Sequence, residues 1–149
     1  MKRRQVLAGV LSGLSICAGC LSRPGATGVA PVEDPPDWLQ QTATCDYPKG
    51  VLHLSEDAVS HADAAAIVAY ETLSEESKRL VRFAIHYHSA ETCTDSGASN
   101  FDKLLNEITE LAYRPYREEH DSRPPSFAIE AEDNYYRIEK MYAFDAVLV

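Results

Sequence analysis

The sequence predicts an α+β fold, a small antiparallel sheet with a C-terminal β-hairpin backed by two α-helices and preceded by a signal peptide and a flexible linker. Three observations lead to this prediction. Short β-rich runs lie on both sides of two stretches of helical periodicity, and the chain begins with a basic, then apolar, then proline-rich region. We therefore expect a signal peptide over 1–19, a linker over 20–44 and one small domain over 45–149.

The first residues have the order of a secretory signal. Arg3 and Arg4, followed by glutamine, valine and leucine, resemble the twin-arginine export motif. The uncharged segment 6–18 is shorter than the about 20 residues that a membrane-spanning helix needs. It leads into Ile-Cys-Ala-Gly and Cys20, which resembles a lipobox, in which the cysteine sulfur accepts the lipid. Cys20 is the predicted lipid attachment site, and an ordinary cleaved signal with incidental cysteines is the alternative.

The segment after Cys20 is expected to be a linker. Its prolines and glycines forbid a continuous helix and disfavour a strand. Trp38 is the exception in this polar stretch, and we expect Asp37-Trp38-Leu39 to dock onto the domain that follows.

The first half of the domain predicts two short strands and a helix. Residues 50–54 and 66–70 are rich in valine, isoleucine and leucine, as strands are. Ser74 then has the side chain of an N-cap, and Glu75 and Glu76 suit the positive end of a helix dipole. Apolar residues recur at a spacing of three to four after these glutamates, so the helix buries one face.

The second half predicts a loop, a helix and a hairpin. The polar stretch 92–100 is expected to be a loop, with a helix from Phe101 that Pro115 ends. Two alternating β-rich runs, 126–132 and 135–142, then flank Asp133-Asn134, a pair that tolerates positive φ and so favours a hairpin turn.

Charge excludes one class of partner. The chain has 14 basic and 23 acidic residues, and removal of Lys2, Arg3 and Arg4 with the signal leaves 11 against 23, a net charge of −12. Such a protein lacks the basic surface that nucleic acid requires, so no nucleic-acid partner is expected. Only four lysines remain in the mature chain, and this acidic, lysine-poor composition is typical of proteins that work in concentrated salt, with an acidic secreted protein as the alternative.

Two resemblances follow from these residues. The twin-arginine lipobox and the acidic composition together resemble a lipoprotein of a halophilic archaeon. The order Tyr-Glu-Thr-Leu-Ser over 70–74, a capped helix, Tyr113-Arg114-Pro115-Tyr116 and Tyr135-Tyr136-Arg137 is similar to an uncharacterised domain of small haloarchaeal proteins. That resemblance implies a fold and no activity, cofactor or site.

Two cysteines remain in the mature domain once Cys20 carries lipid. Cys45 and Cys93 are predicted to form a disulfide, because paired cysteines in an exported domain are commonly bridged. Two free thiols are the alternative, since twin-arginine cargo folds in a reducing cytosol before export.

The candidate chemistry is sparse. His86 and His88, with Cys93 nearby, suggest a metal site, but residues two apart on a helix point in different directions and no metal-binding motif accompanies them. Sequence motifs of nucleophilic catalysis or phosphate binding are lacking as well. The tyrosines and arginines form a possible binding surface, which consists of Tyr113, Arg114, Tyr116, Tyr135, Tyr136 and Arg137.

Two hypotheses follow. The first is a non-catalytic binding or cell-envelope module without a cofactor, held on the outer face of the cell membrane by a lipid anchor and recognising an envelope protein or a small ligand. The second is a small extracytoplasmic metal protein or enzyme that uses His86, His88 and Cys93.

Overall fold

The computed structural model of the protein describes residues 29–55 and 66–149. The predicted export residues Arg3 and Arg4 and the predicted lipid site Cys20 lie outside the described residues. Within the two described ranges, no helix combines the length and the apolar character needed to cross a bilayer.

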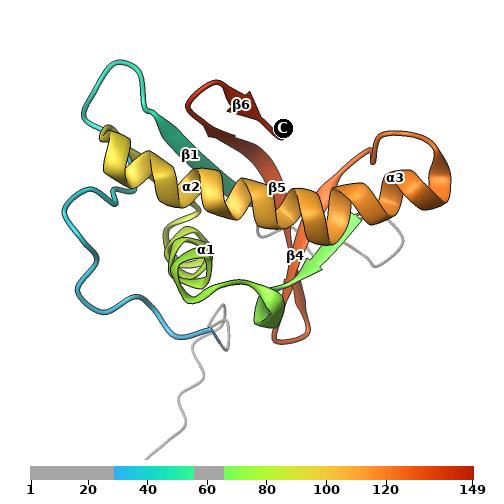
Figure 1. The fold of residues 1–149 in the computed structure, drawn as a ribbon. Helices are drawn as coiled ribbons and strands as arrows, with labels where there is room; N and C mark the ends of the chain where they lie inside the picture. The colour runs from blue at the N-terminus through green and yellow to red at the C-terminus, as the bar shows by residue number, and fades with distance from the viewer. Residues whose placement is uncertain (1–28, 56–65) are drawn as a thin grey trace, which may run out of the picture.

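The described chain forms two layers, a sheet and the helices that cover one of its faces (Figure 1). The strand order is β2-β4-β5-β1-β3, and β6 pairs with β5 beside this path. The predicted α+β architecture, with its C-terminal hairpin, is confirmed. The strands are β1 Gly50–Ser55, β2 Ala66–Ala69, β3 Ser89–Thr92, β4 Phe127–Ala131, β5 Asn134–Ala143 and β6 Ala146–Val147.

The sheet is mostly antiparallel. β5 pairs antiparallel with β1, β4 and β6, and β1 pairs antiparallel with β3. The pair of β2 with β4 is parallel, which the sequence did not indicate. A short 3₁₀ turn, η1 (Tyr70–Thr72), leads from β2 into the first helix.

The first helix begins where the sequence predicts. In α1 (Glu75–Tyr87) the side chain of Ser74 accepts a hydrogen bond from the backbone N–H of Ser77, and two glutamates occupy the first turn. The helix ends at His88, whose φ of 68° is left-handed.

The second helix begins earlier than predicted. The expected loop over 92–100 instead contains the end of β3 and the start of α2 (Asp95–Ile108). The side chain of Thr94 caps this helix by accepting a hydrogen bond from the N–H of Gly97 at 3.0 Å. Gly97 resembles a loop residue in the sequence, but tight packing in the first turn of α2 requires it: an added Cβ would meet the side chains of Thr92 and Trp38.

Pro115 does not end the second helix, contrary to the prediction. α2 continues through a π-helical segment, η2 (Thr109–Tyr113), into α3 (Arg114–His120). Across the π segment the N–H of Arg114 bonds to the carbonyl of Thr109. We attribute the continuation to this wider turn, because a proline ring clashes with the preceding turn of an ordinary α-helix.

The hairpin turn lies one residue earlier than predicted. Glu132 and Asp133 occupy the turn with φ of 46° and 64°, and Asn134 already pairs with Ala131 at the start of β5. Two successive residues with positive φ match the twist of the flanking strands. Asn134 supports the turn by donating from Nδ2 to the carbonyl of Glu132 at 3.0 Å.

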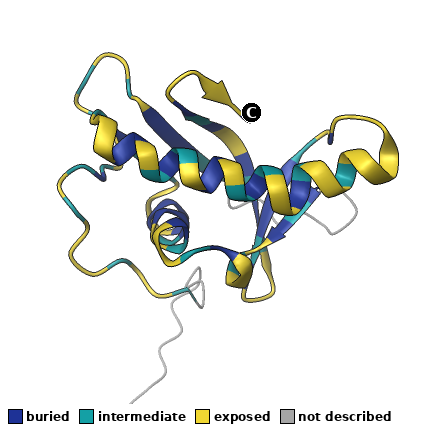
Figure 2. Ribbon diagram, viewed as in Figure 1, coloured by how far each residue is buried: buried dark blue, intermediate teal, exposed yellow. Residues whose placement is uncertain are grey.

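The core lies between the sheet and the helices. Figure 2 shows α2 with alternating buried and exposed residues along its length, as an amphipathic helix on a sheet requires. The largest fully buried side chains of this layer are Leu52, Leu80, Phe101, Leu104, Ile108, Phe127, Ile129 and Met141.

The segment before β1 docks onto the sheet, as predicted for Asp37-Trp38-Leu39. Leu39 is buried and Trp38 packs against the core. Gln40 and Glu91 exchange two backbone hydrogen bonds at 2.7 and 3.0 Å, so this segment covers the outer edge of β3. The predicted disulfide Cys45–Cys93 is confirmed, with a Cα–Cα distance of 6.0 Å.

Replacement of Gly97 tests the close packing at the start of α2. Gly97→Ala places a methyl group against Thr92 and Trp38, so we expect a loss of about 1–3 kcal/mol in the free energy of unfolding. Chemical denaturation measures this loss. Ser99→Ala, at an exposed position of the same helix, is the matched control and is expected to change stability by less than about 0.5 kcal/mol. Equal stability of Gly97→Ala and the control would contradict the packing described here.

Candidate functional site

A recess lies along one edge of β5, between the part of the strand that pairs with β4 and the part that pairs with β6. β4 pairs with β5 as far as Arg137, whereas β6 pairs with Tyr142 and Ala143. The residues between these two pairings border a hollow of about 550 Å³. Its volume falls within the range of about 300–1,000 Å³ that is usual for sites of small molecules.

The opposite edge of β5 contains a bulge at the same level. Lys140 pairs with His53 and Ile138 pairs with Leu54, so Glu139 is an extra residue without a partner in β1. A bulge bends the strand that contains it and redirects the side chains beside it. β5 therefore departs from regular geometry beside the recess.

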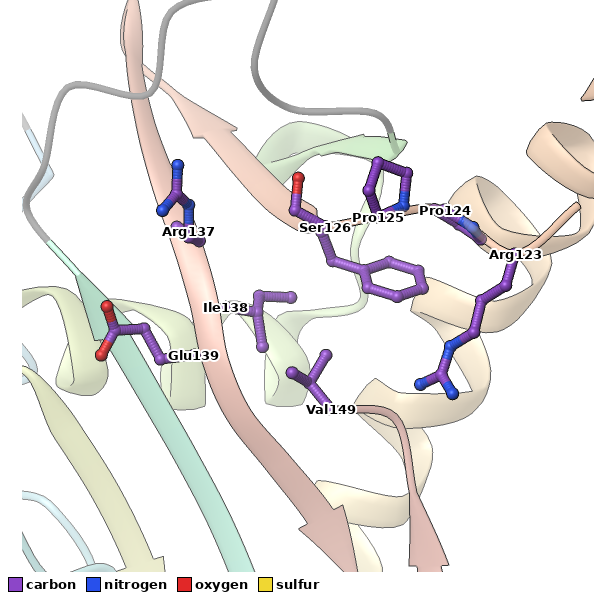
Figure 3. A pocket seen from close by; sticks show the side chains of 9 residues that line it. Arg123, Pro124, Pro125, Ser126, Arg137, Ile138, Glu139 and Val149 are labelled. Carbon is purple, nitrogen blue, oxygen red and sulfur yellow. The ribbon is translucent and has the colours of Figure 1, made fainter.

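The recess has an apolar lining and two cationic residues. Arg123 lies in the loop between α3 and β4, and Arg137 lies on β5. In Figure 3 the side chains of Ile138 and Val149 lie between these two arginines, and the side chain of Glu139 points away from them. The remaining lining residues are Pro124, Pro125, Ser126 and Phe127.

The two guanidinium groups differ in their hydrogen bonding. Arg123 donates from Nη2 to the carbonyl of Leu148 at 2.6 Å, which ties its loop to the chain after β6. Nε of Arg137 is buried and has no hydrogen-bond partner among the described residues. A buried N–H group without an acceptor lowers the stability of the fold. A bound group that accepts a hydrogen bond from Nε of Arg137 would remove this penalty.

The predicted tyrosine and arginine surface is divided in the structure. Tyr113 and Tyr116 are half-buried against the core, and the guanidinium of Arg117 lies 5.9 Å from the ring of Tyr113. Arg114 forms an ion pair with Glu110 at 2.6 Å. This part of the set therefore already has partners within its own helix.

The tyrosines of β5 lie on opposite faces of the sheet, as expected for adjacent strand residues. Tyr136 is buried in the core between the sheet and the helices. Tyr135 packs with Ala128 and Ile67 on the other face, in a small separate cluster. Of the six predicted surface residues, Arg137 is the member that lines the recess.

The histidine pair does not form a metal site in the structure. His86 is exposed in the last turn of α1 with its ring 4.6 Å from that of Tyr87, and His88 follows the helix end. Cys93, the third predicted ligand, is bonded to Cys45 and has no thiolate to offer. Among the residues that the structure describes, no three His, Cys, Asp or Glu side chains gather to hold an ion.

A second polar cluster lies on the sheet beside the docked segment. Nε2 of His53 lies 2.8 Å from Oε1 of Glu91, and Oε2 of Glu91 accepts a hydrogen bond from the N–H of Ala43 at 2.8 Å. Burial, and to a smaller extent the charge of Glu91, raise the pKa of Tyr142 above its ordinary value. This cluster fastens the docked segment to β1 and β3.

Sequence reasoning did not identify Arg123. Its one local signal is its place before Pro124 and Pro125, whose fixed backbone angles stiffen the loop that leads into β4. The sequence does not show that this loop lies beside the chain after β6.

No protein-family model matches this chain, and no curated protein and no solved structure gives a significant match. The resemblance to haloarchaeal domains therefore stays a prediction from the sequence.

Titration of Tyr142 tests the electrostatics of the second cluster. The absorbance difference between the protein and its Tyr142→Phe variant is expected to show a pKa above 10.0 for this phenol. Glu91→Gln should lower that pKa without restoring the ordinary value, because burial is the larger cause.

Glu130→Gln is the matched control, since Glu130 lies beside Tyr135 rather than Tyr142. An unchanged Tyr142 pKa in Glu91→Gln, or an equal decrease in the control, would show that Glu91 does not act on this phenol.

Proposed function

We propose that the protein is a lipid-anchored, extracytoplasmic binding module of the cell envelope. In this proposal Cys20 carries the lipid, the linker holds the domain near the membrane, and the recess beside β5 receives a ligand. The observation that carries the extracytoplasmic location is the Cys45–Cys93 disulfide, because stable disulfides are typical of exported proteins.

The sequence supports attachment by lipid. Residues 16–20 resemble a lipobox, and the segment before them is too short to remain as a membrane helix. Two acyl chains on one residue suffice for stable anchoring, because each buried CH₂ group contributes about 0.8 kcal/mol. The surrounding acidic chain is unsuited to adsorption on anionic headgroups, which favours a covalent anchor over surface charge as the means of attachment.

The composition supports a setting of high salt. The mature chain has a net charge of −12, and concentrated counterions screen the repulsion among its carboxylates. The proposal therefore includes export through the twin-arginine route in a halophilic archaeon, as the resemblance implies.

Binding is favoured over metal chemistry. The metal hypothesis depends on His86, His88 and Cys93, and the sulfur of Cys93 is in the disulfide. The recess supplies an apolar surface with two arginines, which is a suitable composition for holding a ligand.

Loss of the predicted lipid site tests the anchor. Cys20→Ser removes the sulfur that accepts the lipid, so the variant is expected in the medium or as uncleaved precursor rather than as a lipidated membrane protein. Cell fractionation and the intact mass of the membrane form measure the outcome. Cys17→Leu is the matched control: it removes a neighbouring thiol while placing the usual lipobox residue, and it should stay lipidated.

Continued presence of mature Cys20→Ser on the membrane, at the level of the unchanged protein, would contradict the proposed anchor. Release of both variants would instead indicate that attachment also depends on the thiol of Cys17.

A further inference from the structure

The recess is lined by both apolar and charged side chains. Val149, which is 40% exposed, and the edge of the core residue Ile138, which is 2% exposed, form its apolar lining, and Arg123 and Arg137 stand at its two sides (Figure 3). Among the described side chains that line it, Glu139 is the one acidic side chain, and it points away from both arginines in this view. The described side chains of the lining thus include two cationic groups and one anionic group, in a chain whose overall charge is strongly negative.

The arginines are prepared to bind an anion. The contact of Arg123 with the carbonyl of Leu148 fixes its guanidinium and uses one of five N–H donors. Nε of Arg137 is buried without an acceptor from the described residues, so its N–H gains a partner when an anionic oxygen enters. Guanidinium groups bind carboxylate and phosphate oxygens with charge-assisted hydrogen bonds.

The negative charge of the rest of the protein makes the recess more selective as a binding place for an anion. Acidic residues outnumber basic ones in the chain and repel small anions, whereas two arginines line the recess. The apolar lining favours a ligand whose anionic group is attached to a hydrophobic body, because a fully hydrated ion gains nothing from Ile138 and Val149.

We propose that the recess binds a small organic anion, with its charged group on Arg137 and its apolar body against Ile138 and Val149. The inference rests on the proposed function as a binding module and names its ligand class. It does not depend on the lipid anchor, because the recess lies within the folded domain.

Titration with simple probes tests the ligand class. Full-length protein, purified in detergent with its disulfide intact, is titrated with phenylacetate while ¹H–¹⁵N spectra record the backbone of β5 and Nε–H of Arg137. We expect saturable shifts at Ile138 and Arg137. Acetate, which lacks the apolar body, and 2-phenylethanol, which lacks the charge, should each bind at least about tenfold more weakly.

Variants of Arg137 locate the interaction. Arg137→Gln should weaken phenylacetate binding at least about tenfold, and Arg137→Lys, which keeps the charge but loses Nε–H, should give an intermediate affinity. Arg79→Gln removes an exposed arginine of α1 as the matched control and should bind as the unchanged protein does. Thermal unfolding of each variant separates a loss of binding from a loss of fold.

Equal binding of 2-phenylethanol would reduce the recess to an apolar hollow and overturn the proposal. Equal binding of acetate, or an unchanged affinity in a folded Arg137→Gln variant, would overturn it as well. Release of Cys20→Ser from the membrane together with no binding of phenylacetate contradicts the ligand class alone. Binding of phenylacetate by a chain that keeps its membrane attachment without Cys20 contradicts the anchor alone.

Discussion

The bond between Cys45 and Cys93 is the constraint on which the functional account depends. It joins the segment that arrives from the predicted anchor to the junction of β3 and α2. The two cysteines are separated by 48 positions in the sequence. In the chain-entropy model, a disulfide that closes a loop of this length contributes about 4 kcal/mol to stability. The same segment buries Leu39 and pairs Gln40 with Glu91, so the outer edge of β3 is covered rather than open to pairing with another chain. A force on the predicted linker would therefore act on a segment that is covalently bonded at the sheet.

In the proposed export through the twin-arginine route, the domain folds before this bond can form. Several contacts that do not involve sulfur are consistent with that order. Contacts of Trp38 with the core, the backbone pairing of Gln40 and the bond from Ala43 to Glu91 do not involve sulfur. They hold the chain against β3, and the two cysteine Cα atoms then lie 6.0 Å apart, a distance that suits a bridge. In the proposed route, oxidation outside the cytosol would then secure an arrangement that is already formed.

The features that the sequence predicted correctly are those with local causes. Ser74 and the glutamates after it define the start of α1, and alternating runs around a turn define the hairpin. The errors have two kinds of cause. Gly97 lies in the first turn of α2, where the distant Trp38 packs against it, whereas Pro115 follows a local π turn that the sequence pattern did not indicate. The recess combines a loop residue, Arg123, with a strand residue, Arg137, and depends on the change of neighbours along β5. A single sequence shows neither that Arg123 and Arg137 line one recess nor that β5 changes its partner strand. Arg137 itself was among the residues predicted to form a binding surface.

In the proposed function, a lipid at Cys20 holds the disulfide-bonded domain at the membrane, and the recess of that domain receives the ligand. The central claim of the proposed function is that the folded domain resides in an oxidising compartment. This claim is tested most directly on protein taken from intact cells. Cells are treated with an alkylating reagent at lysis, and the membrane-bound protein is digested without reduction and its peptides are identified by mass. The account predicts a linked peptide pair that contains Cys45 and Cys93, with neither sulfur alkylated. Alkylation of both cysteines in most of the molecules would contradict it.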